Sequence, residues 1–300
     1  MRVIHSWTDS SATISVEGLT RPVRVLHVTD THMAVVDERD AEHIATCRGA
    51  SDRFLHRHQN RDAHGKPISP EDAFTHIMAA FGSQELDLIA LTGDIVDFPA
   101  QANVDYVLAG VEIAGAPMLY TAGNHDWMFP TLAETADQGV LRETWWPALA
   151  RLYTREVACS ILDISGVRFL AIDDSTYQIT EAQLEFVRKG LAAGLPTVIL
   201  THIPLSIATL RGPTIDMKES PILLGDPDWV LADRRRFGVG EDTPTTLEFV
   251  RLLASAENLV AILCGHIHFP HVDAVSPYAI QYVGAPGYAG EYRLVELQPL

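Results

Sequence analysis

The sequence predicts an α/β fold with a functional site at the carboxyl ends of its strands. Short apolar runs alternate along the chain with segments of helical periodicity, which is typical of a largely parallel sheet. Five runs are followed within three residues by Asp, Asn or His, and they end at Val28, Thr92, Thr121, Thr201 and Cys264. Because open α/β sheets bind ligands at this edge, we expect these polar residues to form one site.

The first half of the chain alternates regularly between strands and helices. Ser69 at an N-cap and Pro70 at the first helical position mark the start of one helix. The expected strands are 13–17, 23–28, 86–92 and 117–121, and the expected helices are 73–81 and 103–113.

The second half adds a hairpin and further pairs of strand and helix. Alternating runs flank Ser165-Gly166, which favours a β-hairpin, and Thr180 is typical of a helix N-cap. The last two runs alternate as antiparallel strands do. The expected helices are 131–153, 180–191 and 246–256, and the expected strands are 157–164, 167–172, 197–201, 259–264, 279–283 and 292–297.

Two polar segments interrupt this rhythm, at about 37–70 and 205–243. The first contains four histidines and is interpreted as a solvated insertion with short helices at 41–47 and 51–58, or as a flap over the site. The second carries the run Arg234-Arg235-Arg236, which is expected to be a solvated helix end or to bind a phosphate. Neither segment resembles a linker, so we expect one domain over residues 1–300.

The overall charge narrows the classes of partner. With 39 acidic and 22 basic residues, the formal charge is −17, and such a surface repels polyanions, so a nucleic-acid polymer is not expected to bind. Three widely spaced cysteines indicate neither a disulfide framework nor a thiolate metal site. The amino terminus lacks a signal-peptide pattern, and no apolar run reaches the length of a membrane span. A cytoplasmic location is therefore expected.

One tetrapeptide, Gly123-Asn124-His125-Asp126, carries a distinct combination of residue types. Glycine permits a tight turn, and the Asn124 carbonyl is a neutral metal ligand. His125 is able to exchange a proton near neutral pH, and Asp126 is expected to orient its imidazole ring. Alone, the tetrapeptide is more typical of a turn than of a site, so the prediction depends on the other strand ends.

The polar residues at the five strand ends have the chemistry of a metal centre. They offer oxygen and imidazole ligands without thiolates, a combination that suits Mn, Fe, Zn or Co. There are more of them than one ion needs, and a carboxylate such as Asp94 is able to bridge two ions. Two ions roughly 3.5–4 Å apart polarise a phosphoryl oxygen and activate a bridging water. The candidate residues are Asp30, His32, Asp94, Asn124, His125, His202, His266 and His268.

In these motifs the chain resembles the calcineurin-like metallophosphoesterase superfamily. The family pattern has five blocks: Asp-x-His, Gly-Asp-x-x-Asp, Gly-Asn-His-Asp/Glu, a separate His, and Gly-His-x-His. All five stand here in order, at 30–32, 93–97, 123–126, 202 and 265–268. The resemblance implies a four-layer α-β-β-α sandwich of two mixed sheets with the metal site at the carboxyl ends of the strands.

The resemblance also implies roles for individual residues. Asp94 would bridge two metal ions, and a metal-bridging hydroxide would attack phosphorus in line. His125 would bind no metal but would protonate the leaving oxygen, with Asp126 orienting it. The first ion would be held by Asp30, His32, Asp94 and His268, and the second by Asp94, Asn124, His202 and His266.

The block pattern is most similar to that of bacterial cyclic-nucleotide and glycerophosphodiester phosphodiesterases. Phe98-Pro99 follows Asp97, whereas serine/threonine protein phosphatases have Arg-Gly there. We therefore expect a phosphodiesterase acting on a small-molecule phosphoester. A phosphomonoesterase with the same metals and a metal-binding scaffold without catalysis are the alternatives. The insertion at 37–70 is expected to cap the site or to form a contact in a homodimer.

Overall fold

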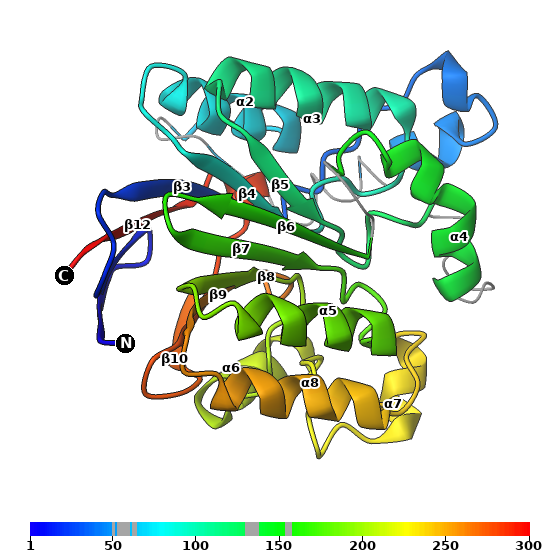
Figure 1. The fold of residues 1–300 in the computed structure, drawn as a ribbon. Helices are drawn as coiled ribbons and strands as arrows, with labels where there is room; N and C mark the ends of the chain where they lie inside the picture. Colours follow the sequence, from blue (N-terminus) through cyan, green and yellow to red (C-terminus); the bar gives the residue numbers. More distant parts are fainter. Residues whose placement is uncertain (50–51, 53–60, 62–64, 130–137, 154–157) are drawn as a thin grey trace.

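The structure is a computed structural model of the 300-residue chain. It describes all residues except 50–51, 53–60, 62–64, 130–137 and 154–157. Two six-stranded sheets lie face to face, with helices on the outer side of each, so the predicted four-layer arrangement is confirmed (Figure 1).

The first sheet is mixed. β3, β4 and β5 run parallel, whereas β12 is antiparallel to β3 and parallel to β2. In spatial order the strands are β1 (Val3–Trp7), β2 (Ser11–Val16), β12 (Arg293–Pro299), β3 (Val23–Val28), β4 (Leu88–Thr92) and β5 (Met118–Thr121).

The second sheet has a parallel centre with one antiparallel strand at each edge. β7, β8, β9 and β11 form the parallel part, and β6 and β10 close the edges. In spatial order the strands are β10 (His271–Ala274), β11 (Ile280–Val283), β9 (Leu259–Cys264), β8 (Thr197–Leu200), β7 (Val167–Ile172) and β6 (Cys159–Ile164).

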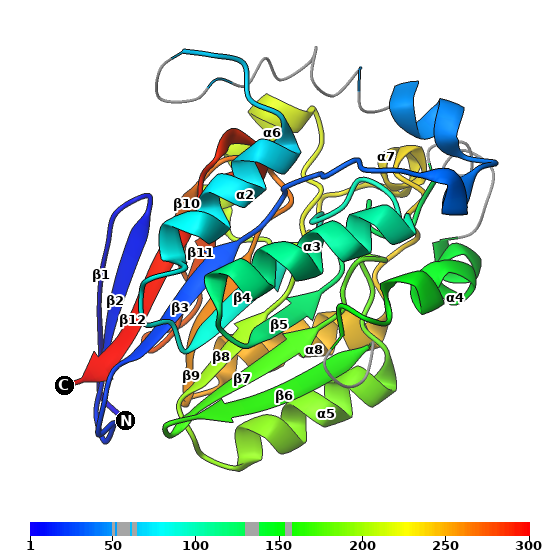
Figure 2. The same cartoon turned by 90° about the horizontal axis from the view of Figure 1, so that it is seen from above.

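Three apolar layers hold the sandwich together. Side chains alternate between the two faces of a strand, so each sheet contributes to a central layer and to an outer one. The central layer joins Val25 and Ala90 of the first sheet to Phe169 and Leu263 of the second, all of them buried. The outer layers pack under α2 (Pro70–Phe81) and α3 (Gln101–Ala114) on one side, and under α5 (Glu181–Ala192) and α8 (Pro244–Ser255) on the other (Figure 2).

The expected helix starts have the predicted caps. The Ser69 side chain accepts a hydrogen bond from the Asp72 N–H at 3.0 Å, and Thr180 forms a capping box with Gln183. The expected hairpin is also present, because Ser165 and Gly166 both have positive φ in the turn between β6 and β7. Helix caps and hairpin turns depend on a few neighbouring residues, so they could be predicted from the sequence without knowledge of the fold.

Other elements differ from expectation. The segment expected to be irregular contains α6 (Ala208–Lys218) and α7 (Leu231–Arg236). β1 and β10 were not expected, and β11 is parallel to β9 rather than part of an antiparallel pair at the chain end. The structure also has α4 (Gln138–Leu149), η1 (Glu38–Asp40) and η2 (Gly287–Ala289), and residues 44–49 are helical, which overlaps the expected short helix 41–47.

The basic run in the second insertion has a structural role at its first residue. Arg234 is buried, its guanidinium carbon lies 4.7 Å from the centre of the Trp229 ring, and it pairs with Asp242 at 2.5 Å. This arginine is therefore neither solvated nor placed to bind a phosphate. Most of the expected helix 51–58 and residues 131–137 of the expected helix 131–153 lie outside the described residues. Over the described part of the chain, the helices are too short or too polar to cross a bilayer.

Candidate metal centre

Loops from both sheets build one polar cluster between the carboxyl ends of the strands. The loop after β3 is joined to the loop after β4, since the Asp30 N–H donates to the Gly93 carbonyl at 3.0 Å and the His32 N–H to the Asp94 carbonyl at 2.9 Å. The loop after β9 joins them through the His266 N–H, which donates to the Asp30 carboxylate at 2.9 Å. Two backbone hydrogen bonds and one bond from a backbone N–H to the Asp30 carboxylate thus fix three loops against one another.

The cluster is marked by a left-handed backbone, which is unfavourable for any residue except glycine. Eight of the described non-glycine residues have positive φ, and seven of them lie at the cluster or the cavity beside it. Each such residue costs about 1–2 kcal/mol relative to the ordinary helical region, and such strain gathers at functional sites. The seven are Asp30, His32, Asp94, Tyr177, Glu219, His266 and His268, and the eighth is Ser165.

One group of predicted ligands surrounds a single point. The ligand atoms of Asp30, His32, Asp94 and His268 all lie within 4.8 Å of one another. The Nε2 atoms of His32 and His268 are 3.1 Å apart, and Nε2 of His268 is 3.4 Å from Oδ1 of Asp30. Two imidazole nitrogens and two carboxylates that converge in this way form a donor set for one divalent ion.

A second group shares Asp94 with the first. The ligand atoms of Asp94, His202 and His266 lie within 4.8 Å of one another, and Nε2 of His202 is 3.2 Å from Oδ2 of Asp94. Asn124 faces the same cavity as Asp94 and His266, and its Oδ1 atom is buried with no hydrogen-bond partner among the described residues. A buried carbonyl oxygen without a donor fits a bound cation, so these residues suit a second ion that shares Asp94.

In three of the candidate ligand histidines, one ring nitrogen has a polar partner within the protein. Nδ1 of His202 lies 2.9 Å from the Thr92 carbonyl, which only accepts, so this nitrogen carries a proton and Nε2 is the nitrogen that faces Asp94. Nε2 of His266 lies 2.8 Å from the Tyr177 hydroxyl. Nδ1 of His32 lies 3.2 Å from Oδ1 of Asp97. Such partners orient a metal-binding imidazole and fix its tautomer. No sequence motif indicated this role for Tyr177 or Asp97.

His125 projects toward the cavity beside this cluster. Its side chain is 46% exposed, and its backbone N–H donates to Oδ1 of Asp94 at 2.8 Å. We expected Asp126 to orient the ring, but the carboxylate next to Nδ1 is that of Asp97, at 3.1 Å. Asp97 therefore contacts both His32 and His125 with one oxygen, and it links a candidate ligand to the candidate acid.

The Asp126 carboxylate instead organises the turns that carry the cluster. It is buried and accepts hydrogen bonds from the backbone N–H groups of Asp94 at 2.8 Å, Val96 at 2.9 Å and Gly123 at 2.5 Å. It thus connects the loop after β4 with the loop after β5. A Cβ on Gly123 would collide with the Asp94 carboxylate, so only glycine allows this approach.

Replacement of Asp126 with alanine is expected to destabilise the fold by about 3–5 kcal/mol, because three buried N–H groups lose their acceptor. Urea unfolding followed by circular dichroism measures the loss. Asp126→Asn is the matched control, since it keeps one acceptor oxygen and should lose less. An unchanged free energy of unfolding in Asp126→Ala would contradict this structural role.

The candidate ligand histidines differ in the direction in which their surroundings shift the pKa. Burial lowers the pKa of His266 well below its usual value and that of His268 to about 4, so both rings are neutral, which is the form that binds metal. For His202 burial also lowers the pKa, but the charge of Asp94 outweighs it and raises the pKa to about 10. The Asp97 carboxylate is disfavoured by burial, yet hydrogen bonds with His125 and His32 lower its pKa to about 2. The pKa values of Asp30 and Asp94 are also lowered, because the charges of neighbouring histidines outweigh burial, so these three carboxylates stay charged and attract cations.

Comparison with known proteins agrees with this site. Residues 23–270 match the sequence model of the family described as calcineurin-like phosphoesterase, and the chain belongs to this family. Its fold is similar to that of a dimetal phosphatase from Danio rerio, with 12% identity over 90% of this chain and 89% of that chain and a TM-score of 0.53. It is also similar to a purple acid phosphatase from yellow lupin (Lupinus luteus) seeds, with 16% identity over 94% of this chain and 47% of that chain and a TM-score of 0.54. No curated protein matches the sequence.

Proposed function

We propose that this protein is a dimetal phosphodiesterase and that residues 1–300 work as one domain. Membership in the calcineurin-like phosphoesterase family supports hydrolysis of a phosphoric ester with metal ions. The observation that carries the proposal is the pair of ligand groups that share Asp94. When bound, two ions of the Mn, Fe, Zn or Co type supply Lewis acidity and an activated water.

The proposed ligand sets follow the two groups. Asp94 belongs to both, and its two oxygens suit a bridge between the ions. Asn124 joins the second set because its buried carbonyl oxygen has no donor among the described residues. The first ion takes Asp30, His32, Asp94 and His268, and the second takes Asp94, Asn124, His202 and His266.

His125 is proposed to give a proton to the leaving oxygen. It is the partly exposed histidine beside the cluster, and the negative charges of Asp94 and Asp97 favour its protonated form. Asp97, at 3.1 Å from Nδ1, holds the ring and leaves Nε2 as the nitrogen that would give the proton. A general acid in this position lowers the barrier by stabilising the alkoxide as it departs.

The charge around the cavity favours a diester over a monoester. Among the described residues that line it, Lys218 is the one with a permanent positive charge, and Glu219 beside it is acidic. A monoester brings about two negative charges and a diester one, so the diester needs less compensation from the protein. The cavity also has a volume of about 500 Å³, which leaves room for a second ester group beside the phosphorus.

The test compares bis(4-nitrophenyl) phosphate with 4-nitrophenyl phosphate on metal-stripped protein, with and without added Mn²⁺. We expect Mn²⁺-dependent cleavage with kcat/KM for the diester at least about tenfold above that for the monoester. Preference for the monoester would favour the phosphomonoesterase alternative. Two bound ions without cleavage of either ester would favour the scaffold alternative.

A further inference from the structure

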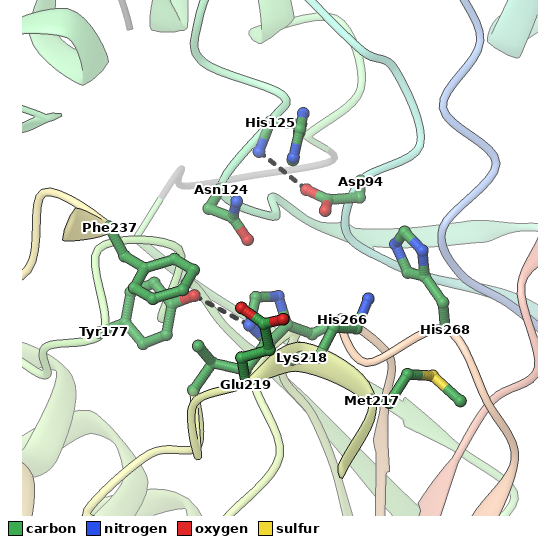
Figure 3. A pocket seen from close by; sticks show the side chains of 11 residues that line it. Asp94, Asn124, His125, Tyr177, Met217, Lys218, Glu219, Phe237, His266 and His268 are labelled. Carbon is green, nitrogen blue, oxygen red and sulfur yellow. Dashed lines mark hydrogen bonds between the residues drawn. The ribbon is translucent and has the colours of Figure 1, made fainter. Parts of the chain in front are cut away.

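The cavity beside the metal cluster has a second wall, whose residues are neither the proposed metal ligands nor the proposed acid. Asp94, Asn124 and His125 form one side, and Lys218 and Glu219 at the end of α6 face them across the cavity (Figure 3). The wall also contains two aromatic residues, Tyr177 and Phe237, on the side away from His268 (Figure 3).

The aromatic part of this wall is rigid. The Phe237 ring is half-buried, and its centre lies 5.9 Å from that of Trp229. Trp229 is buried and lies 5.3 Å from the Tyr177 ring, with Arg234 stacked over it. A ring that is packed on one side and faces a cavity on the other offers a surface for a flat aromatic group.

The polar part of the wall is held in place at a conformational cost. Helices commonly end in a left-handed residue that is usually glycine, as α3 does at Gly115. α6 ends instead at Glu219, with φ of 60°. Glycine would be more favourable here, so the left-handed backbone of Glu219 costs free energy. α6 is anchored near its start because Arg211 pairs with buried Asp226 at 3.1 Å, and this fixes where Glu219 lies.

We propose that this wall binds the alcohol part of the substrate, and that this part is a flat aromatic group with N–H or O–H donors and no negative charge. Its ring stacks on Phe237, and its donors bind the Glu219 carboxylate. A negatively charged group is repelled by Glu219 and by the overall charge of −17. This inference rests on the proposed diesterase activity and names the substrate class for the same site.

The test uses methyl phosphodiesters that differ only in the second alcohol, which is ethyl, 2-phenylethyl, 2-(4-aminophenyl)ethyl or 2-(4-carboxyphenyl)ethyl. The Mn²⁺-loaded full chain is used, and hydrolysis is followed by phosphorus NMR. We expect KM to fall about tenfold from ethyl to phenylethyl, since the ring is buried and stacked, and about tenfold again with the amine. The carboxyphenyl ester should show no such second decrease, and its KM should be at least as high as that of the phenylethyl ester.

Two variants test the two contacts. Phe237→Leu keeps an apolar side chain but should remove most of the difference in KM between ethyl and phenylethyl. Glu219→Gly should raise KM for the aminophenyl ester to that of the phenyl ester, and it should raise the melting temperature by about 2–4 °C because the backbone strain is relieved. If Glu219→Gly has a higher KM for the aminophenyl ester and also a higher melting temperature, the weaker binding does not come from damage to the fold.

Ser165→Gly is the matched control. Ser165 also has positive φ, at 48°, but it lies in the hairpin turn between β6 and β7. Its replacement should raise the melting temperature in the same way and leave every KM unchanged. A KM that does not depend on the alcohol, or that changes equally in Glu219→Gly and Ser165→Gly, would overturn the inference.

A binding measurement separates this inference from the proposed activity. Calorimetry with the free alcohols 2-(4-aminophenyl)ethanol and 2-phenylethanol requires no hydrolysis. Tighter binding of the amine to the unmodified protein, lost in Glu219→Gly, supports the subsite even when no diester is cleaved. Equal binding of both alcohols refutes it even when diesters are cleaved.

Discussion

Replacing His125 with alanine is expected to lower kcat by about 10²–10⁴-fold while both metal ions stay bound. The ring converges with His32 and Asp97 but belongs to neither of the two groups that contain Asp94, and Asp97 lies at its Nδ1 atom. Its loss should therefore remove the proton donor without removing a ligand. Steady-state kinetics measures kcat, and elemental analysis of dialysed protein measures the metal content.

The dependence on the leaving group makes this test specific to acid catalysis. A 4-nitrophenolate departs readily without a proton, whereas an alkoxide does not. The loss in His125→Ala should thus be much smaller for a nitrophenyl ester than for a dialkyl ester. Asp97→Asn is the matched comparison, since it keeps the shape of the residue but removes its charge from His125. Normal turnover of dialkyl esters by His125→Ala would refute the assignment.

Replacing Asp94 with asparagine is expected to lower kcat by more than about 10³-fold and to reduce the bound metal below two ions per chain. Asp94 is the residue that both ligand groups contain, so both lose charge when it is neutralised. Asparagine tolerates the left-handed backbone at this position, where φ is 48°, so the fold should persist. Metal content and kcat are measured on the same preparation.

Asp163→Asn is a suitable control for this change. It also replaces a carboxylate by an amide, but in β6, where Asp163 pairs with Arg168 on the surface at 2.7 Å. It should keep two ions and full activity. If Asp94→Asn retained two bound ions, the bridging carboxylate would not be needed for metal binding. The proposal that two ions share Asp94 would then be refuted.

The strand ends were predictable because each is signalled locally. An apolar run followed by a polar ligand type is visible in the sequence, and parallel strands bring such ends to one edge. The structure places Asp30, His32, Asp94, His202, His266 and His268 in the two converging groups, with Asn124 at the same cavity. Their proximity depends only on the order of strands in the two sheets.

The partner of His125 was not predictable in the same way. Asp126 follows His125 directly, but the chain turns there, and the carboxylate points back to the backbone N–H groups of Asp94, Val96 and Gly123. Asp97 reaches the ring from another loop. Side-chain direction in a turn is set by individual φ and ψ angles, for which the sequence has no periodic signal.

The helices of the second insertion could not be predicted either, because their sequences show no clear helical pattern. α6 contains Gly212 and Pro213, which usually mark a loop, and among its residues only Leu210 and Thr214 are buried. α7 has six residues, too few for a visible helical period. Both helices exist because of tertiary contacts, and so the wall of the cavity that they carry could not be foreseen.

The proposed metal ligands are divided between the two sheets and span most of the chain. Asp30, His32, Asp94 and Asn124 come from the first sheet, and His202, His266 and His268 follow strands of the second. The unfolded chain holds no such arrangement, so ion binding and folding are thermodynamically linked. Each tenfold excess of free ion over its dissociation constant adds about 1.4 kcal/mol to the stability of the folded state. It follows from the proposed ligand sets that the fraction of folded protein increases with the concentration of free metal ion in the surroundings.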